Sequence, residues 1–394
     1  MDKLPRRAAI TAAICSALAM PLLTPLAATA DPCGGNGSAG AFGWFGGGGQ
    51  NTNPADGPDS TGNNAKSNIV EWLTGPKSKQ ASGLAIGGTD LGIMWDNGVK
   101  GPSHKVLVMF GDTFSCTGDG NHRSNVMFRS PDANLSDGMA IPGSAFGYAQ
   151  GGAPIDLGGG SARKMIDSLP TNAPEITVIP TAGIAINDGV QVVNYMSVQA
   201  WGQPGYWTTN YSALAVSYDN GETFTSVPRT MRTNDGGNQN FQMGAFVKKD
   251  GYIYSFGTPQ GRQGSAYVSR VSEPRVFELE QYEYWNGQSW VSGDASAATP
   301  VMRGPIAEMS VAWNDYLKKF ISLTYADGSI QLRTADVPEG PWSDPRSILD
   351  DGQLPGGFYG PFIHPWSSGP DLYYTLSLWS TYNVLLMHTR LDGQ

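Results

Sequence analysis

Short runs of β-forming residues recur along this chain, and helical periodicity is nearly absent. Each run is about four to eight residues long and is bounded by Asp-Gly, Asn-Gly or Gly-Gly, which are typical turn signals. Over about three hundred residues this pattern predicts more strands than an ordinary sandwich holds. A radial array of small sheets accommodates them with short, protected edges, so we expect an all-β fold, a five-bladed β-propeller. Clear runs lie at 191–198, 212–218, 252–256, 265–271, 320–325 and 372–378.

The runs group into repeating units, as a propeller requires. Residues 217–224 read Ser-Tyr-Asp-Asn-Gly-Glu-Thr-Phe, which has the spacing of the Asp-box turn of propeller sialidases. In that turn the aspartate caps a hairpin, so the motif indicates a blade and not a catalytic site. A strand near Ile69 is expected to complete the last sheet, and 131–173 is expected to be a long inserted loop. The expected blades are 80–130, 175–230, 240–292, 304–347 and 357–392.

The first part of the chain has the pattern of an exported protein. Basic residues precede a mostly apolar run at 8–28, and Ala28-Thr29-Ala30 offers a small-x-small cleavage site. Two prolines interrupt the apolar run, so we expect no permanent membrane span. The following glycine-rich, polar tract cannot bury enough apolar surface to fold. We therefore predict a secreted or cell-envelope protein with a signal peptide at 1–30, a flexible leader at 31–67 and a β-propeller catalytic domain at 68–394.

Cysteine usage agrees with export. Of three cysteines, Cys15 leaves with the signal peptide, and Cys33 and Cys116 remain as one possible pair. In an oxidising compartment a disulfide is favoured over two free thiols. In the chain-entropy model, closing so long a loop contributes on the order of 4–5 kcal/mol. We predict a structural disulfide between Cys33 and Cys116.

Charge and composition exclude several kinds of partner. The formal net charge is −9, and no basic run could neutralise phosphates, which argues against nucleic acid and anionic membranes. Only 15% of residues are charged, while Gly, Ser, Asn and aromatic residues are plentiful, a surface that suits neutral sugars. The four histidines are scattered without ligand spacing, and no Cys-x-x-Cys occurs. We therefore expect no metal and no cofactor.

Two aspartates are the candidate catalytic residues. Asp90 follows Gly-Gly-Thr, and Asp112 follows an apolar strand that breaks at Gly111. The two stretches read as neighbouring strands of one hairpin, and two carboxylates on adjacent strands are the minimum equipment for glycoside hydrolysis. The alternative, equally open from the residues alone, is that each carboxylate bonds its own turn backbone. We hypothesise that desolvation raises the pKa of Asp112, a general acid, while glycine N–H groups keep Asp90 ionised as base or nucleophile.

Other residues are candidates for holding a sugar. Arg123 and Asn125 follow Asp112 closely, and Arg262 opens a strand; for each arginine a simple salt bridge is an equal alternative. Glu308 is a lone charge at the start of a strand, expected to face a central funnel or to pair with an arginine. Aromatic residues are expected to stack on sugar rings or to cap a sheet. The remaining substrate-binding candidates are Tyr359, His364 and Trp201.

Several of these motifs recur together in one known family. The chain resembles the actinobacterial endo-D-arabinanases, long catalogued as a domain of unknown function, over about 70–391. The resemblance is carried by Gly-Thr-Asp-Leu-Gly, Phe-Gly-Asp-Thr-Phe, Arg-Ser-Asn, Gly-Arg, Glu-Met-Ser and Tyr-Gly-Pro-Phe. It implies a five-bladed propeller that hydrolyses internal α-D-arabinofuranosyl linkages of arabinogalactan and lipoarabinomannan. Two first-blade aspartates carry catalysis in that family, and they match Asp90 and Asp112.

The resemblance leaves alternatives of other classes. One departure is the insertion 97–105, which we expect to lie beside the cleft and to alter which arabinan branch fits. A rival function is a wall-binding propeller that recognises glycan without cutting it. Another is a sialidase-like enzyme or a furanosidase of different substrate, although only Arg123 and Arg262 suggest the arginine cluster that sialidases need. The expected partner is a polysaccharide, and the chain is expected to act as a monomer.

Overall fold

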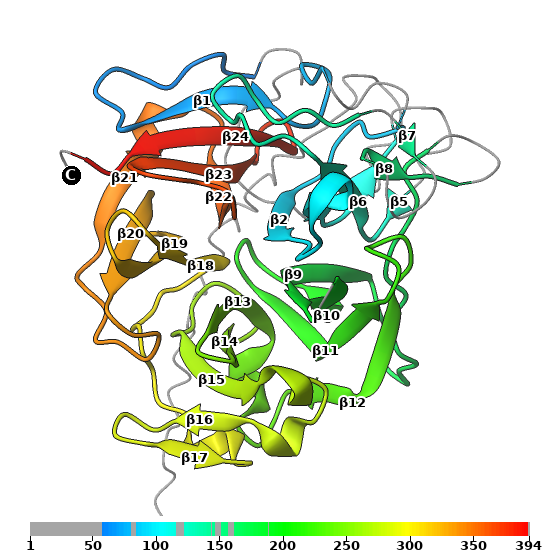
Figure 1. The fold of residues 1–394 in the computed structure, drawn as a ribbon, viewed down its shortest axis with the longest axis vertical. Coiled ribbons are helices and arrows are strands. Elements are labelled where there is room, and N and C mark those ends of the chain that lie inside the picture. The colour runs from blue at the N-terminus through cyan, green and yellow to red at the C-terminus, as the bar shows by residue number, and fades with distance from the viewer. Residues whose placement is uncertain are drawn as a thin grey trace, which may run out of the picture.

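Five β-sheets surround a common centre, with one edge of each sheet turned toward it (Figure 1). This computed structural model describes residues 57–79, 84–115, 122–142, 144–145, 151–156, 161–187 and 189–392. The prediction of an all-β, five-bladed propeller is confirmed. Within the described ranges the only helices are short 3-10 turns, and none of them is long and apolar enough to cross a membrane.

The innermost strands form the wall of the central channel. Each contacts the innermost strand of the next blade, and the last contacts the first, so the ring is closed. These strands are rich in apolar residues, and every residue of β9 is buried, because both faces pack against neighbouring blades. The innermost strands are β2 (Leu91–Asp96), β9 (Thr177–Ile186), β13 (Met243–Lys249), β18 (Met309–Asn314) and β22 (Phe358–Ile363).

The other strands extend each blade outward by antiparallel pairing. The first blade adds β3 (Val106–Phe110) and β6 (Val126–Ser130). The second adds β10 (Val190–Trp201), β11 (Trp207–Ser217) and β12 (Thr225–Thr233). The third adds β14 (Tyr252–Thr258), β15 (Tyr267–Ser272), β16 (Glu283–Trp285) and β17 (Trp290–Ser292). The fourth adds β19 (Lys319–Ala326), β20 (Ser329–Ala335) and β21 (Arg346–Asp350), and the fifth adds β23 (Asp371–Leu378), β24 (Asn383–Arg390) and β1 (Ser67–Trp72).

Short elements fill the connections. Two small pairs of strands are β4 (Thr113–Phe114) with β5 (His122–Arg123), and β7 (Ser144–Ala145) with β8 (Ala153–Pro154). The 3-10 turns are η2 (Gly101–Ser103), η3 (Asn238–Phe241), η4 (Glu273–Arg275), η5 (Leu279–Gln281), η6 (Ala295–Ala297) and η7 (Asp351–Gln353).

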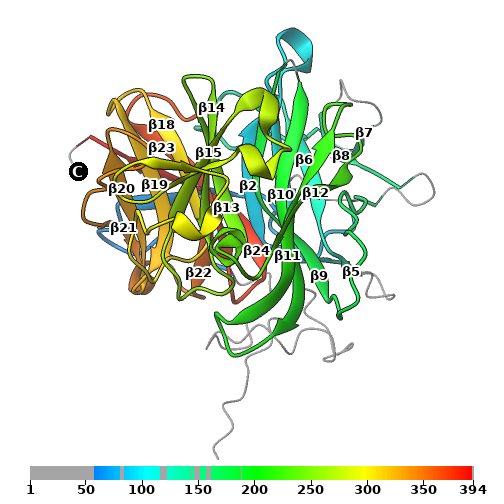
Figure 2. The ribbon, with the colours of Figure 1, turned by 90° about the horizontal axis from the view of Figure 1, so that it is seen from below.

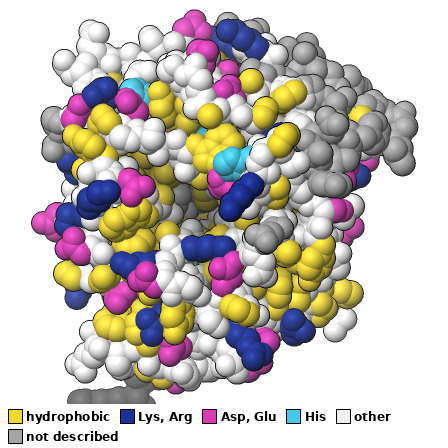
Figure 3. All heavy atoms as spheres, in the orientation of Figure 1, with side chains coloured by type: hydrophobic (Ala, Val, Ile, Leu, Met, Phe, Trp, Pro, Cys, Tyr) yellow, Lys and Arg dark blue, Asp and Glu magenta, His cyan; other side chains and the backbone are white. Residues whose placement is uncertain are grey.

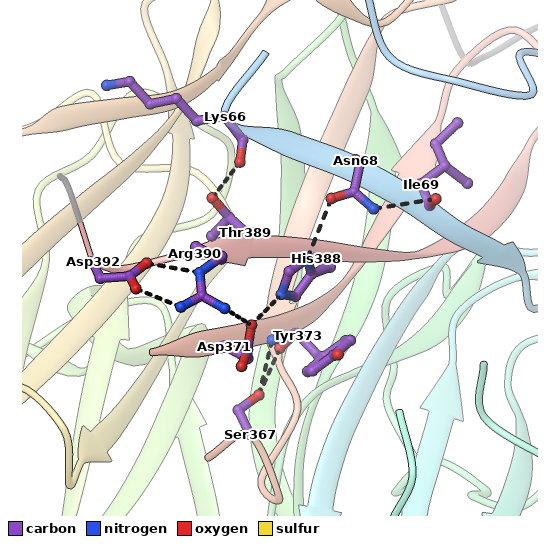
Figure 4. A network of polar contacts seen from close by, with 10 residues as sticks. All are labelled: Lys66, Asn68, Ile69, Ser367, Asp371, Tyr373, His388, Thr389, Arg390 and Asp392. Atoms are coloured by element: carbon purple, nitrogen blue, oxygen red, sulfur yellow. Dashed lines mark hydrogen bonds and ion pairs between the residues drawn. The ribbon is translucent and has the colours of Figure 1, made fainter. Parts of the chain in front are cut away.

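The strand that precedes the first blade closes the ring. As expected for the segment near Ile69, β1 pairs antiparallel with β24 and becomes the outer strand of the fifth blade. Side chains reinforce this pairing (Figure 4): the Thr389 hydroxyl donates to the Lys66 carbonyl over 2.7 Å, and the His388 ring lies between Asn68 and Asp371. The two ends of the domain are therefore joined within one sheet.

The segment just before β1 lies against the propeller. The Trp72 indole N–H donates to the Pro58 carbonyl over 3.2 Å, and the Gly62 N–H donates to the Gln353 carbonyl over 2.6 Å. Gly57 packs so close to the Trp72 ring that an added Cβ would lie 2.3 Å from it. Residues 57–66 of the expected leader thus contact the folded body. The expected signal peptide, the rest of the leader and the Cys33–Cys116 disulfide lie outside the described residues.

Replacing Trp72 by alanine should loosen this closure. Trp72 is 7% exposed and packs in the core shared by the fourth and fifth blades. Removing a large buried aromatic side chain costs about 3–5 kcal/mol. We expect Trp72→Ala to lower the urea midpoint accordingly, whereas Tyr218→Ala, at a site that is 75% exposed, should change it little. Equal midpoints for the two variants would show that β1 does not secure the ring.

The turn between β11 and β12 has the predicted Asp-box geometry. The Asp219 carboxylate accepts from the Ser217 hydroxyl and from both the N–H and the hydroxyl of Thr223, over 2.5–2.8 Å. These hydrogen bonds lower the pKa of Asp219. Asn220 and Gly221 take positive φ angles of 57° and 80°, which Asn and Gly adopt readily. The aspartate is structural, as the motif indicates.

The insertion 97–105 lies at the wrong end of its hairpin for the role we expected. Leu91 pairs with Phe110 beside the two candidate aspartates, whereas Asp96 pairs with Val106 beside the insertion. The length of β2 separates them, and in Figure 2 the β2–β3 connection (cyan) and the β10–β11 turn (green) lie at opposite edges of the body. Asn97 instead bonds Asn220 of the second blade over 2.8 Å. The insertion therefore braces two blades.

Candidate active site

The two candidate aspartates meet in one pocket at the end of the propeller opposite the 97–105 insertion. Asp90 immediately precedes β2 and Asp112 follows β3, and the Gly111 N–H donates to the Asp90 carbonyl over 3.1 Å. The hairpin therefore brings both carboxyls to the same pocket, as predicted. Asp90 is 8% exposed and Asp112 is 4% exposed. Buried carboxyl groups need either partners or a proton.

Asp90 is held in an environment that favours its neutral form. The Tyr359 hydroxyl donates to Asp90 Oδ2 over 2.8 Å, and Oδ1 is buried beside Gly111. A Cβ at Gly111 would come 2.4 Å from Oδ1, so only glycine leaves room for this carboxyl. Burial, and then the charge of Asp112, raise the pKa of Asp90 to about 8.

This reverses the roles that we assigned from the sequence. We expected the glycine N–H groups near Asp90 to keep it ionised, but the Gly87 and Gly88 N–H groups donate to the Phe114 carbonyl, and the Gly111 N–H donates to the Asp90 carbonyl and not to its carboxyl. Because burial raises the pKa of Asp90 to about 8, this group carries a proton at neutral pH and is the candidate general acid.

Asp112 is held by two donors on one oxygen. Its Oδ1 accepts a hydrogen bond from the Thr177 hydroxyl and lies 2.7 Å from His122 Nε2. The His122 ring packs on Phe114, with ring centroids 5.1 Å apart. Thr177 begins the innermost strand of the second blade, so two blades orient this carboxyl. Surroundings that donate hydrogen bonds suit a carboxylate that acts as base or nucleophile, because an ionised carboxylate only accepts them.

Arg262 and Glu308 form a paired charge in the same pocket. Arg262 Nη2 and Nε lie 2.5 and 3.0 Å from the two Glu308 oxygens, a two-pronged pairing. The guanidinium also lies over three aromatic rings, those of Trp207, Tyr359 and Trp379, at 4.9–5.3 Å from each centroid. Glu308 thus both pairs with an arginine and faces the pocket, the two alternatives that the sequence left open.

Aromatic side chains form much of the remaining wall. Trp201, a candidate from the sequence, lines the pocket together with Trp207, and their rings pack edge to face with centroids 6.0 Å apart. Tyr359 stacks on Trp379 with a centroid distance of 3.8 Å. Trp207 and Tyr359 are buried, whereas Trp201 and Trp379 are partly exposed. Flat rings around a few polar groups are typical of sites that bind sugar rings.

Three sequence candidates lie outside the pocket lining. Arg123 is buried and donates to the carbonyls of Leu84, Ala85 and Ala162, so it fastens loops of the first blade. Asn125 bonds the backbone of residues 165, 166 and 178. His364 is 1% exposed and accepts from the Trp366 N–H, and burial lowers its pKa to about 3. Their assignment to substrate binding is corrected: these side chains position the backbone.

Two pocket residues were missed by the sequence reasoning. Trp379 and Tyr382 sit on the turn between β23 and β24, and both line the pocket. Tyr382 takes a φ of +51°, which is strained for an aromatic residue, and its carbonyl accepts from the Thr89 N–H beside Asp90. The available signal was a pair of aromatic residues in the last hairpin turn, where a polar turn is usual.

Comparison with known proteins places the chain in a family. A family model described as a domain of unknown function, DUF4185, matches residues 75–388. The chain belongs to the DUF4185 family. This DUF4185 chain is similar to Notoamide biosynthesis cluster protein J of Aspergillus sp. (strain MF297-2), with 31% identity over 342 residues, covering 83% of this chain and 89% of the relative. Protein J' of Aspergillus versicolor is 29% identical over 325 residues, covering 78% and 85%.

This DUF4185 chain is similar to solved structures at low sequence identity. A protein of Bacteroides ovatus, provisionally described as a hydrolase, has a TM-score of 0.54 and 14% identity, covering 78% of this chain and 87% of its own. Zg3597, a family 117 glycoside hydrolase of Zobellia galactanivorans, has a TM-score of 0.47 and 10% identity, covering 84% and 92%. At these identities the similarity to the Bacteroides protein shows the architecture alone.

Other kinds of site find no support in the described part of the chain. It contains no group of three or more His, Cys, Asp or Glu residues that could hold a metal ion. On the face drawn in Figure 3, basic and acidic side chains are interspersed and form no basic stripe among the residues described.

Proposed function

We propose that this protein is a glycoside hydrolase that cleaves internal α-D-arabinofuranosyl linkages of cell-wall arabinan, in arabinogalactan and lipoarabinomannan. One observation carries the proposal: a carboxyl with a pKa of about 8 and a second carboxyl held by two donors share one aromatic-walled pocket. Two carboxyls in one pocket, one of them protonated, are the acid and base equipment of glycosidases. The arabinan substrate rests on the resemblance to endo-D-arabinanases, and the expected signal peptide would bring the enzyme to the cell envelope.

The geometry assigns a role to each group. Tyr359 donates a hydrogen bond to Asp90 Oδ2, and the raised pKa of Asp90 keeps a proton on this carboxyl group. Asp90 would give this proton to the glycosidic oxygen as the bond from that oxygen to the anomeric carbon breaks. Asp112 would then stabilise the developing positive charge, either attacking the anomeric carbon or removing a proton from the attacking water.

Release of oligosaccharides from purified arabinogalactan tests this function. We expect the wild-type protein to produce arabinose oligosaccharides of several lengths, as internal cleavage requires, and Asp90→Asn to release them about 10²–10⁴-fold more slowly. A protein that binds arabinan but releases nothing would be a wall-binding propeller. Products from sialosides or other furanosides, with none from arabinan, would support a hydrolase of different substrate.

Tyr359→Phe should shift the pH dependence of the reaction. The hydrogen bond from Tyr359 lowers the pKa of Asp90 against the larger effect of burial, so its removal should raise that pKa further. We expect the alkaline limb of kcat/KM to move upward by up to about one pH unit, with stacking on Trp379 retained. Tyr282→Phe, which removes an equally buried hydroxyl in the third blade, is the control. An unmoved limb in Tyr359→Phe would separate Tyr359 from the acid.

A further inference from the structure

The catalytic pocket continues into a groove across the third and fourth blades. A second cavity shares Pro204, Gly205, Arg262, Tyr359 and Trp379 with the aspartate pocket. A third cavity shares Gln263 and Pro305 with the second. Because consecutive cavities share lining residues, they form one path that leads outward from the two aspartates.

The β10–β11 turn forms one wall of this path. Pro204 and Gly205 line both the first and the second cavity. The Arg262 N–H donates to the Gly205 carbonyl over 2.9 Å, so the turn is fastened to the third blade beside the paired charge. The groove is thereby built from four blades, the second to the fifth, which makes it part of the architecture and not a gap between surface side chains.

The lining of the groove indicates what it binds. Trp379, which stacks on Tyr359, and Tyr325 are half-buried aromatic residues, while Gln263 is exposed and offers an amide that both donates and accepts. Glu308 neutralises the charge of Arg262, and the Asp327 carboxylate in the second cavity is offset by Arg303 in the third, so the lining has no excess charge of either sign. A ligand with flat apolar faces and many hydroxyls but no charge fits these groups, and this describes a neutral sugar chain.

We propose that this groove binds the sugar residues on one side of the cleaved linkage. The polysaccharide would then run from Asp90 and Asp112 over the third and fourth blades. This inference rests on the proposed function. Trp379 lies at the junction of the first two cavities. Tyr325 and Gln263 line the second cavity but not the first, so they would contact only the distal sugars. For substrates too short to reach the second cavity, kcat/KM should not depend on Tyr325 or Gln263.

A series of arabinan oligosaccharides of increasing length tests the groove. For the wild type we expect kcat/KM to rise with length beyond the residues that fill the first pocket. Tyr325→Ala should remove roughly tenfold of that rise, which corresponds to about 1.4 kcal/mol, and Gln263→Ala a smaller part. Both should cleave the shortest substrate at the wild-type rate, and Gln288→Ala, an exposed glutamine on the β16–β17 turn, should match the wild type throughout. Gln263 lies on the surface, so its variant is expected to fold even if Tyr325→Ala does not.

Binding to Asp112→Asn protein, followed by tryptophan fluorescence, separates this inference from the function itself. Tighter binding of longer chains, lost in the Tyr325→Ala background, would support the groove even if the wild type hydrolysed nothing. Hydrolysis that is independent of chain length would overturn the groove and leave the function standing. Equal losses on short and long substrates in Gln263→Ala would also overturn it.

Discussion

Asp90→Asn should slow hydrolysis of arabinan by several orders of magnitude, about 10²–10⁴-fold, and at the same time stabilise the fold. The amide keeps the shape of the carboxyl but cannot donate its proton to the leaving oxygen. General acid catalysis typically contributes about 10²–10⁴-fold, so we expect a loss of this size in kcat on polysaccharide. Because both Asp90 and its partner Tyr359 lie in the pocket, binding should change much less than kcat.

The gain in stability follows from the raised pKa. In the unfolded chain Asp90 ionises near its ordinary value of 3.8, and in the fold near 8, so the native state binds the additional proton. The free energy of unfolding therefore falls as pH rises from about 4 to about 8, by on the order of 4 kcal/mol at pH 7. Asparagine does not titrate, so the stability advantage of Asp90→Asn should be small at pH 4 and grow to a plateau above pH 8.

Urea unfolding at several pH values measures this effect. We expect the two midpoints to diverge between pH 4 and 8 and then to run parallel. Asp327→Asn, at an exposed turn between β19 and β20, is a control that should show no such divergence. A variant that is less stable than the wild type at pH 8 would mean that Asp90 is ionised and paired in the native protein.

Asp112→Asn should lower kcat on arabinan at least as much as Asp90→Asn does. A better leaving group should not restore the activity of Asp112→Asn. In the proposed mechanism the Asp112 carboxyl stabilises the sugar cation, and its Oδ1 is already fixed by Thr177 and His122. An acidic phenol departs from an aryl arabinofuranoside as the phenolate, so it needs no proton from a general acid. On this substrate Asp90→Asn should recover most of its activity, whereas Asp112→Asn should stay at least about 10³-fold below the wild type.

The leaving-group test also exposes an exchange of roles. If Asp112→Asn were the variant rescued by the acidic phenol and Asp90→Asn stayed inactive, then Asp112 would be the acid, as the sequence alone suggested. Thr177→Val is a matched control, because it removes one donor to Asp112 while the carboxylate remains. It should reduce the rate on both kinds of substrate by a modest and similar factor.

The blade pattern could be predicted from the sequence because it is local. Turn residues and runs of β-formers mark strands directly, and the Asp-box at 217–224 reports its own turn through hydrogen bonds within a few residues. The pairing of Asp90 with Asp112 was also accessible, since one hairpin joins them. Ring closure by β1 followed from an unpartnered strand at the start of the domain.

The electrostatics of the site could not be predicted in this way. The burial that raises the pKa of Asp90 comes from contacts of long sequence separation, such as Tyr359 and the β23–β24 turn. Arg123 and Asn125 lie near Asp112 in the sequence, but their side chains bond backbone groups around residues 84–85 and 162–178. Proximity along the chain does not tell whether a polar side chain faces the pocket or the backbone beneath it.

The central claim is that Asp90 is neutral at physiological pH and loses its proton only in alkaline solution. Infrared difference spectroscopy of protein labelled with ¹³C at aspartate carboxyls measures this directly, with Asp90→Asn protein as the reference. The account predicts a protonated-carboxyl band that disappears near pH 8 in the wild type and is missing in the variant. A band that disappears near pH 4, with no difference between the two proteins above that pH, would contradict it.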